Sequence, residues 1–198
     1  MKKIITISRE YAAGGRKIAK LVAEQLNIPY YDKDIVKETA KASGFEPELI
    51  ESEGEVVSRT DSILKTICSA SSLQFNDTQE VIHDVQQAII LRLVREGPCV
   101  IVGRCADYIL RESNPTRIFV YADMESKIRR CFERAPENEH LTEKEMRQYI
   151  QKVDKNRAVY YEFYTGRAWG DWHNYDLCIN TSGKDIKVLV DSLTLLQR

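Results

Sequence analysis

The sequence predicts an α/β protein in which a parallel sheet is covered by helices on both faces. Short apolar runs rich in β-branched residues alternate with longer segments of helical periodicity along the chain. One of these runs, 99–102, is apolar at every position, which is typical of a strand buried on both faces. Polar or charged residues directly follow each run, so we expect them to meet at one edge of the sheet.

The bulk properties indicate one soluble globular domain spanning 1–198. The 198 residues are 43% hydrophobic and 30% charged, and the chain is long enough to bury a full core. A formal charge of −1 offers no general attraction to nucleic acid, so we expect no nucleic-acid partner. No apolar run approaches the ~20 residues of a membrane span, and no signal-peptide core is present. We therefore expect no membrane partner and a cytoplasmic location.

The five cysteines do not point to a disulfide framework or to a zinc site. Their number is odd and none of them form close pairs in the sequence. They are Cys68, Cys99, Cys105, Cys131 and Cys178.

The first third of the chain predicts strand, helix, short strand, helix. Residues 3–7 form a β-branched run, and 15–26 place their apolar residues on one helical face. A two-residue strand at 30–31 is followed by Asp32, which we expect to cap a helix ending near 43–44.

The middle third contains the least regular segment, 45–77. Its first residues are rich in glutamate and its later ones are small and polar, and the pattern predicts a helix at 59–68. The segment is either a surface excursion or a segment that contacts the substrate. Beyond it, the pattern predicts a helix at 78–95, the buried strand 99–102 and a short helix at 106–111.

The last third predicts two strands and three helices. A strand at 117–121 precedes a helix at 124–134 that Asp123 would cap, and Thr142 with Glu145 forms a capping box for a helix at 142–164. A strand at 176–180 and a helix at 184–196 complete the alternation, for five strands in all.

The first strand, a glycine-bearing loop and the first helix together resemble a phosphate cradle. Loop amides and a helix N-terminus offer positive potential to an anion. Against the P-loop pattern G-x-x-x-x-G-K-[ST], Arg9 stands at the first glycine, Gly14 at the second and Gly15 at the lysine. An ordinary turn between strand and helix is the alternative. The candidate loop consists of Ser8, Arg9, Glu10, Tyr11, Ala12, Ala13, Gly14, Gly15, Arg16 and Lys17.

Two arginines occupy positions at which packing alone does not explain a charged side chain. Arg104 follows a buried strand and a glycine, so it needs an anionic partner or open solvent at the sheet edge. Arg157 falls on the apolar face of the 142–164 helix, where it either pairs with Asp154 at i, i+3 or points into an anion site.

A basic face on the 124–134 helix is the third cationic feature. It is either a solvated surface or part of the site. Its residues are Lys127, Arg130 and Arg134.

Four sequence segments in combination resemble the cytidylate kinase-like family over nearly the whole chain. They are Ile7-Ser8-Arg9-Glu10-Tyr11 with Gly14-Gly15-Arg16, Pro29-Tyr30-Tyr31-Asp32-Lys33, Ile101-Val102-Gly103-Arg104, and Tyr175-Asp176-Leu177 through Asn180-Thr181-Ser182. More distantly, the chain is similar to bacterial cytidylate kinases. This resemblance implies a three-layer P-loop NTPase fold of the nucleoside monophosphate kinase type, with a five-stranded parallel sheet and a mobile lid.

The resemblance also implies roles for individual residues. Residues 8–17 would form the ATP phosphate loop, 45–77 an acceptor-binding insertion and 129–145 the lid. The implied catalytic residues are Arg16, Lys17, Arg104, Arg130 and Arg134. The implied acceptor-binding residues are Asp32, Arg104, Asp107, Asp154 and Arg157.

The sequence departs from the cytidylate kinases at the parts that bind ATP and metal. Gly15 replaces the lysine, a basic residue replaces the Ser or Thr that would hold Mg²⁺, and Cys105 replaces the aspartate after Arg104, with Asp107 close by. We expect Arg16 or Lys17 to supply the missing cation.

Together these features predict a nucleotide kinase that transfers the γ-phosphoryl of ATP to a nucleoside monophosphate. The expected acceptor is CMP, dCMP or a similar nucleotide. The expected cofactors are ATP and Mg²⁺, with no protein ligand assigned to the metal, and the expected partners are small-molecule nucleotides. The oligomeric state is left open. The alternative function is a non-catalytic nucleotide- or anion-binding module on the same fold.

Overall fold

A five-stranded parallel sheet forms the centre of the computed structural model, which describes residues 3–47, 49–50, 72–133 and 141–196. The strand order is β2-β3-β1-β4-β5, and each neighbouring pair is parallel. This confirms the predicted fold class. The strands are β1 (Ile4–Arg9), β2 (Tyr30–Tyr31), β3 (Cys99–Val102), β4 (Thr116–Tyr121) and β5 (Leu177–Asn180).

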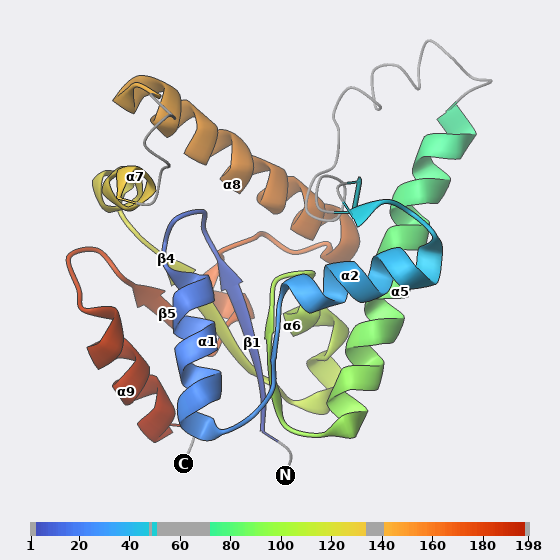
Figure 1. The fold of residues 1–198 in the computed structure, drawn as a ribbon, viewed down its shortest axis with the longest axis horizontal. Coiled ribbons are helices and arrows are strands. Elements are labelled where there is room, and N and C mark those ends of the chain that lie inside the picture. Colours follow the sequence, from blue (N-terminus) through green and yellow to red (C-terminus); the bar gives the residue numbers. More distant parts are fainter. Residues whose placement is uncertain (1–2, 48, 51–71, 134–140, 197–198) are drawn as a thin grey trace.

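Helices alternate with the strands along the chain (Figure 1). They are α1 (Gly15–Leu26), α2 (Lys33–Ser43), α5 (Ser72–Glu96), α6 (Ala106–Ile109), α7 (Met124–Phe132), α8 (Glu143–Thr165) and α9 (Ile186–Leu196), with 3-10 turns at Arg111–Ser113 and Trp172–Asn174.

The two faces of the sheet are buried against different helices, because successive side chains of a strand point to opposite faces. Ile5 and Ile7 of β1 pack with α1 and α9 on one face. Ile4, from the same strand, packs with α5 and α6 on the other. Both faces of β1 are therefore covered by helices, as is usual for parallel sheets.

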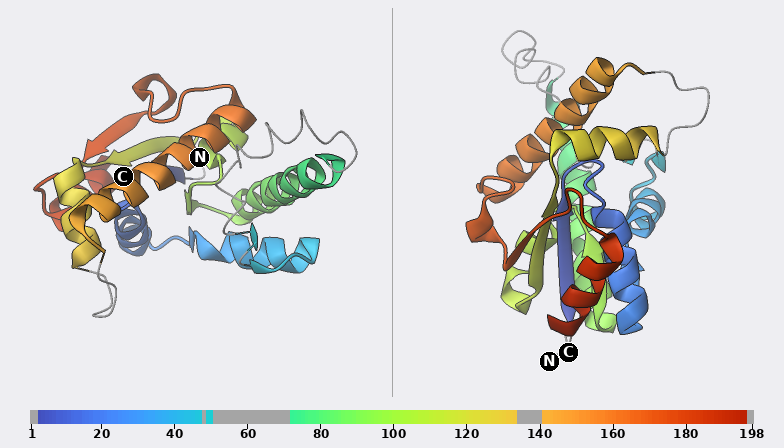
Figure 2. Two further views of the ribbon diagram at one scale, coloured as in Figure 1. Left: turned by 90° about the horizontal axis from the view of Figure 1, so that it is seen from above. Right: turned by 90° about the vertical axis from the view of Figure 1, so that its left-hand side faces the viewer.

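The carboxyl ends of the strands meet at one edge of the sheet, and α7 and α8 lie across that edge (Figures 1 and 2). The two helices also pack on each other, with Ile128 of α7 against Met146 and Ile150 of α8. This arrangement brings two helices over the loop that follows β1.

Most predicted elements appear with small shifts of their ends. The capping box of α8 is present, with Thr142 accepting from the Glu145 amide, and Asp123 caps α7 as expected. The first strand continues to Arg9, two residues beyond the predicted end. α6 stops at Ile109, before the predicted 111.

Some predictions fall outside the described residues. These are the helix at 59–68, most of the 45–77 insertion (48 and 51–71), residues 134–140 of the lid segment, and Arg134 itself. Within the described ranges, no helix combines the length and apolar character that crossing a membrane requires.

Candidate functional site

The loop between β1 and α1 makes a tight turn that ends on the helix N-terminus. Gly14, at the N-cap of α1, has φ 87°, a left-handed conformation that glycine adopts without strain. The first amides of α1 have no acceptor within the helix and point back toward the loop. The local geometry therefore suits an anion held by backbone amides and the helix dipole.

Side chains from α7 and from the residue that follows β5 form hydrogen bonds with the backbone of this loop. Arg130 donates through Nη1 to the Ala12 carbonyl at 3.3 Å and through Nη2 to the Thr181 carbonyl at 2.6 Å. The Thr181 hydroxyl donates to the Ala13 carbonyl at 2.8 Å. Arg130, expected on the lid, thus lies directly against the backbone of the loop between β1 and α1.

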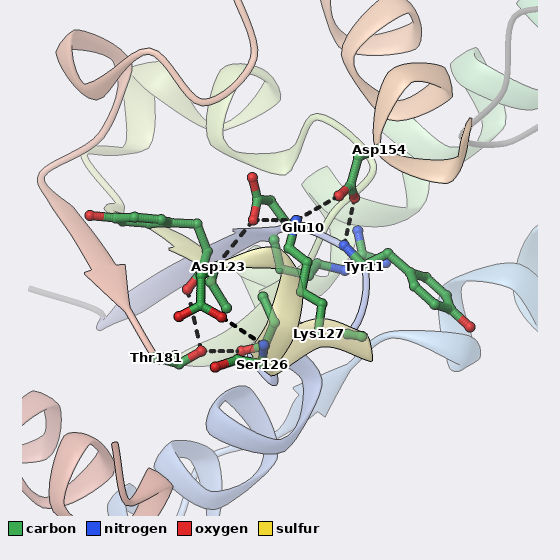
Figure 3. A network of polar contacts seen from close by, with 12 residues as sticks. Glu10, Tyr11, Asp123, Ser126, Lys127, Asp154 and Thr181 are labelled. Carbon is green, nitrogen blue, oxygen red and sulfur yellow. Dashed lines mark hydrogen bonds and ion pairs between the residues drawn. The ribbon is translucent and has the colours of Figure 1, made fainter. Parts of the chain in front are cut away.

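Lys127, one turn before Arg130 on α7, is buried rather than solvated. Its Nζ lies 2.6 Å from Oε2 of Glu10 and 2.9 Å from Oδ2 of Asp154 (Figure 3). Asp154 also accepts from the Tyr11 amide at 2.6 Å. The ammonium therefore links the loop, α7 and α8, and of the two alternatives for the basic face a solvated surface does not apply at Lys127.

A cavity of about 290 Å³ opens beside the loop at the carboxyl edge of the sheet. Positive side chains outnumber negative ones in the part of its wall that the structure describes, so it favours an anion such as a phosphate. Its charged side chains are Arg16, Lys33, Arg104, Arg157 and Asp32.

Two of these arginines reach the cavity from the positions that the sequence singled out. Arg104 follows β3 with φ 59° and is 7% exposed. Arg157 donates to the Arg9 carbonyl at 3.2 Å and lies 3.9 Å from Oδ1 of Asp154. Arg157 therefore pairs with Asp154 and also lines the cavity, and its binding of an anion stays a prediction.

Asp32 carries the negative charge of this wall and is held by two donors. Nε of Arg16 lies 2.8 Å from its Oδ2, and the Tyr30 hydroxyl donates to the same oxygen at 3.1 Å. Burial, followed by the nearby Asp32 carboxylate, raises the pKa of Tyr30, so the hydroxyl remains a donor. Asp32 occupies the N-cap position of α2 but makes no side-chain capping bond, which corrects the expected capping role.

Tyr11 and Tyr149 form an aromatic part of the cavity wall. Their rings meet edge to face with centroids 5.4 Å apart, and the Arg157 guanidinium lies 5.9 Å from the Tyr11 ring. Burial, and next the proximity of Tyr149, raises the pKa of Tyr11 to about 12. The site thus combines cations with flat aromatic rings.

Other predicted site residues lie elsewhere. Lys17 is exposed on α1 and is not among the described residues that line the cavity. Asp107 is buried beneath the site, where it accepts from the Tyr161 hydroxyl at 2.6 Å, and burial raises its pKa. Asp154 holds the loop instead of lining the cavity. Asp107 and Asp154 thus lie outside the described wall of the cavity, and their contact with an acceptor stays a prediction.

Sequence reasoning did not select Lys127, Glu10 or Thr181 for the roles their contacts give them. Glu10 lay inside the predicted loop, but its ion pair joins residues 117 positions apart and has no local signature. Thr181 belongs to the last of the four family-like segments, and nothing in that segment indicates a contact with the loop.

A model of the cytidylate kinase-like family matches residues 4–183. The chain belongs to this family. No curated protein matches the chain. Among solved structures, an uncharacterized protein from Eubacterium ventriosum is 29% identical with a TM-score of 0.72, and the match covers 99% of this chain and 98% of that one.

Two shikimate kinases also share the fold. The enzyme from Bacteroides thetaiotaomicron is 16% identical with a TM-score of 0.59, covering 99% of this chain and 98% of that one. The enzyme from Acinetobacter baumannii, solved in complex with shikimate, is 15% identical with a TM-score of 0.54, covering 98% and 93%. At these identities the likeness concerns the fold, which this cytidylate kinase-like chain shares with P-loop kinases.

The residues of the loop fit a polyphosphate better than a protein-bound metal. Gly14 and the start of α1 present backbone amides, as an anion requires. Gly15, Arg16 and Lys17 carry no hydroxyl that could bind Mg²⁺. In the ranges that the structure covers, no three His, Cys, Asp or Glu residues gather as metal ligands.

Proposed function

We propose that this chain is a phosphotransferase that moves the γ-phosphoryl of ATP to a nucleoside monophosphate such as CMP, dCMP or a similar nucleotide. The observation that carries the proposal is the cationic cavity directly beside an anion-binding loop and helix N-terminus. Two phosphate-bearing ligands could lie next to each other there. Phosphoryl transfer is catalysed mainly by such positioning and by stabilising negative charge.

The cavity wall suits a nucleotide acceptor. Arg104 and Arg157 would hold its phosphate, since guanidinium groups match phosphate oxygens with paired donors. The Tyr11 and Tyr149 rings would pack against its base or sugar. Asp32, fixed by Arg16, would accept from a hydroxyl or amino group. Mg²⁺, carried by ATP, would neutralise phosphate charge.

Replacing Arg104 tests the proposal. In a transfer assay with ATP and a panel of monophosphates, Arg104→Ala should lower turnover by about 10²-fold or more, as loss of one charge-stabilising donor does in other enzymes. Lys20→Ala removes an exposed cation from α1 that is not among the described residues lining the cavity, and provides the matched control. Shikimate belongs in the panel because one structural neighbour binds it. Unchanged turnover in Arg104→Ala would contradict the assignment.

A non-catalytic nucleotide- or anion-binding module is the second candidate function. It is favoured by Gly15, which leaves the loop without the lysine of active P-loop kinases. Calorimetric titration with ATP, with and without Mg²⁺, and with CMP distinguishes the two functions. Binding of both ligands without transfer to any acceptor would support the module.

A further inference from the structure

We propose that Lys127, on α7, supplies to the phosphates of ATP the cation that the loop lacks at position 15. This inference rests on the proposed use of ATP. Gly15 cannot carry a lysine in this structure, because an added Cβ would lie 2.5 Å from Cβ of Arg9 and 3.0 Å from its Cγ. The cation must therefore reach the loop from another element.

The two cations expected to replace the lysine are not placed for this task. Arg16 turns toward the acceptor side, where its guanidinium pairs with Asp32 at 2.8 Å and 3.4 Å. Lys17 is exposed on the outside of α1. Neither lies among the groups that contact the loop backbone in the described part of the chain.

Lys127 does lie at the loop. Its Nζ shares the Asp154 carboxylate with the Tyr11 amide, so one carboxylate separates the ammonium from a loop N–H (Figure 3). Glu10 holds the ammonium from the loop itself, and its Oε2 also accepts from the Ala122 amide at 3.1 Å. These bonds fix the position of Nζ at the Glu10 and Tyr11 end of the loop.

The ammonium keeps a donor for a ligand. An ammonium has three N–H donors. Among the described residues, Lys127 gives one to Glu10 and one to Asp154, which leaves the third for a phosphate oxygen. Packing alone is a weak explanation for these buried charges, since buried ion pairs can often be replaced by apolar groups without loss of stability.

Two substitutions with opposite expected effects on ATP affinity, and a third that keeps the positive charge, test the inference. Lys127→Met removes the charge and keeps the length, and it should weaken ATP binding by about 10- to 100-fold, as expected for a lost charge-assisted hydrogen bond. AMP affinity should change little, because AMP lacks the β- and γ-phosphates. Glu10→Gln keeps the ammonium but removes a competing carboxylate, so it should bind ATP more tightly. Lys127→Arg should restore part of the ATP affinity.

The measurements are calorimetric titrations of each folded variant with ATP and AMP, with circular dichroism and thermal unfolding as fold controls. A clamp with no ligand role predicts that Glu10→Gln and Lys127→Met both leave the ratio of ATP to AMP affinity unchanged. That result, with ATP binding to the wild type intact, would overturn the inference alone. Absence of ATP binding to the wild type would instead overturn the proposed function. If Lys127→Met does not fold, Glu10→Gln still decides, since equal or weaker ATP binding contradicts the inference.

Discussion

Arg9 and Gly15 are in direct contact: a Cβ atom at Gly15 would lie 2.5 Å from Cβ of Arg9. At the equivalent positions a P-loop has a glycine first and a lysine second. Here the first position carries the side chain and the second carries none. The two departures from the motif are therefore one structural change, because the space between β1 and α1 admits a single side chain.

This contact predicts a stability cost for any side chain at position 15. Gly15→Ala should lower the free energy of unfolding by about 1–3 kcal/mol, as overpacking does in other buried sites. Gly97→Ala is the matched control, because nothing lies within 4 Å of a Cβ there. In urea unfolding, Arg9→Gly combined with Gly15→Lys should recover part of the loss found for Gly15→Lys alone. Strict additivity of the two changes would contradict the shared-space explanation.

The hydrogen bonds of the Thr181 hydroxyl predict that this side chain stabilises the fold and the loop. It donates to the Ala13 carbonyl at 2.8 Å and accepts from Arg130 Nη1 at 3.1 Å. Thr181→Val keeps the shape but leaves these groups without their partner, so unfolding should cost about 1–3 kcal/mol less. ATP affinity should fall as well, because the loop loses a brace. Thr181→Ser, which retains the hydroxyl, should stay close to wild type in both measurements; equal losses in the two variants would refute the role of this hydrogen bond.

The buried His83 predicts a pH dependence of stability. Its Nδ1 lies 3.1 Å from the Tyr160 hydroxyl, and its ring stacks on Tyr164 at 3.8 Å. Burial lowers the pKa of His83, so the folded state binds a proton less readily than the unfolded state. Its contribution is present above the ordinary histidine pKa and is lost as the pH falls below it.

Urea unfolding of the wild type and of His83→Asn at pH 7.5 and pH 5.5 measures this contribution. The wild type should lose more stability than the variant between the two pH values, because the amide does not titrate in this range. An identical loss in both proteins would show that His83 does not titrate with folding.

The burial of Asp107 predicts a pH dependence of folding stability with the sign opposite to that of His83. Asp107 is 3% exposed, and burial raises the pKa of its carboxyl group despite the hydrogen bond from Tyr161. The folded state therefore binds this proton more readily, and stability is lost as the pH rises through the folded pKa. Asp107→Asn should be more stable than wild type at pH 8, and its advantage should shrink at pH 4. A difference that is the same at both pH values would contradict this prediction.

Two cationic residues show where sequence reasoning reached the site and where it did not. Arg104 was predictable, because it directly follows a buried strand whose carboxyl end must lie at the binding edge. Lys127 was not, because a lysine at i, i+3 from an arginine has the same pattern on a solvated face as on a buried one.

By itself, the sequence determined the parallel α/β architecture, the order of its elements with approximate ends, and the edge of the sheet at which the candidate site lies. These follow from local periodicity, capping residues and the polarity of parallel strands. Only the tertiary structure decided which cations meet which anions. The Tyr11 amide and the Asp154 carboxylate are 143 residues apart, and Arg16 turns to Asp32 instead of to the loop. Such pairings depend on how α7 and α8 pack over the end of the sheet, and no local pattern encodes that packing.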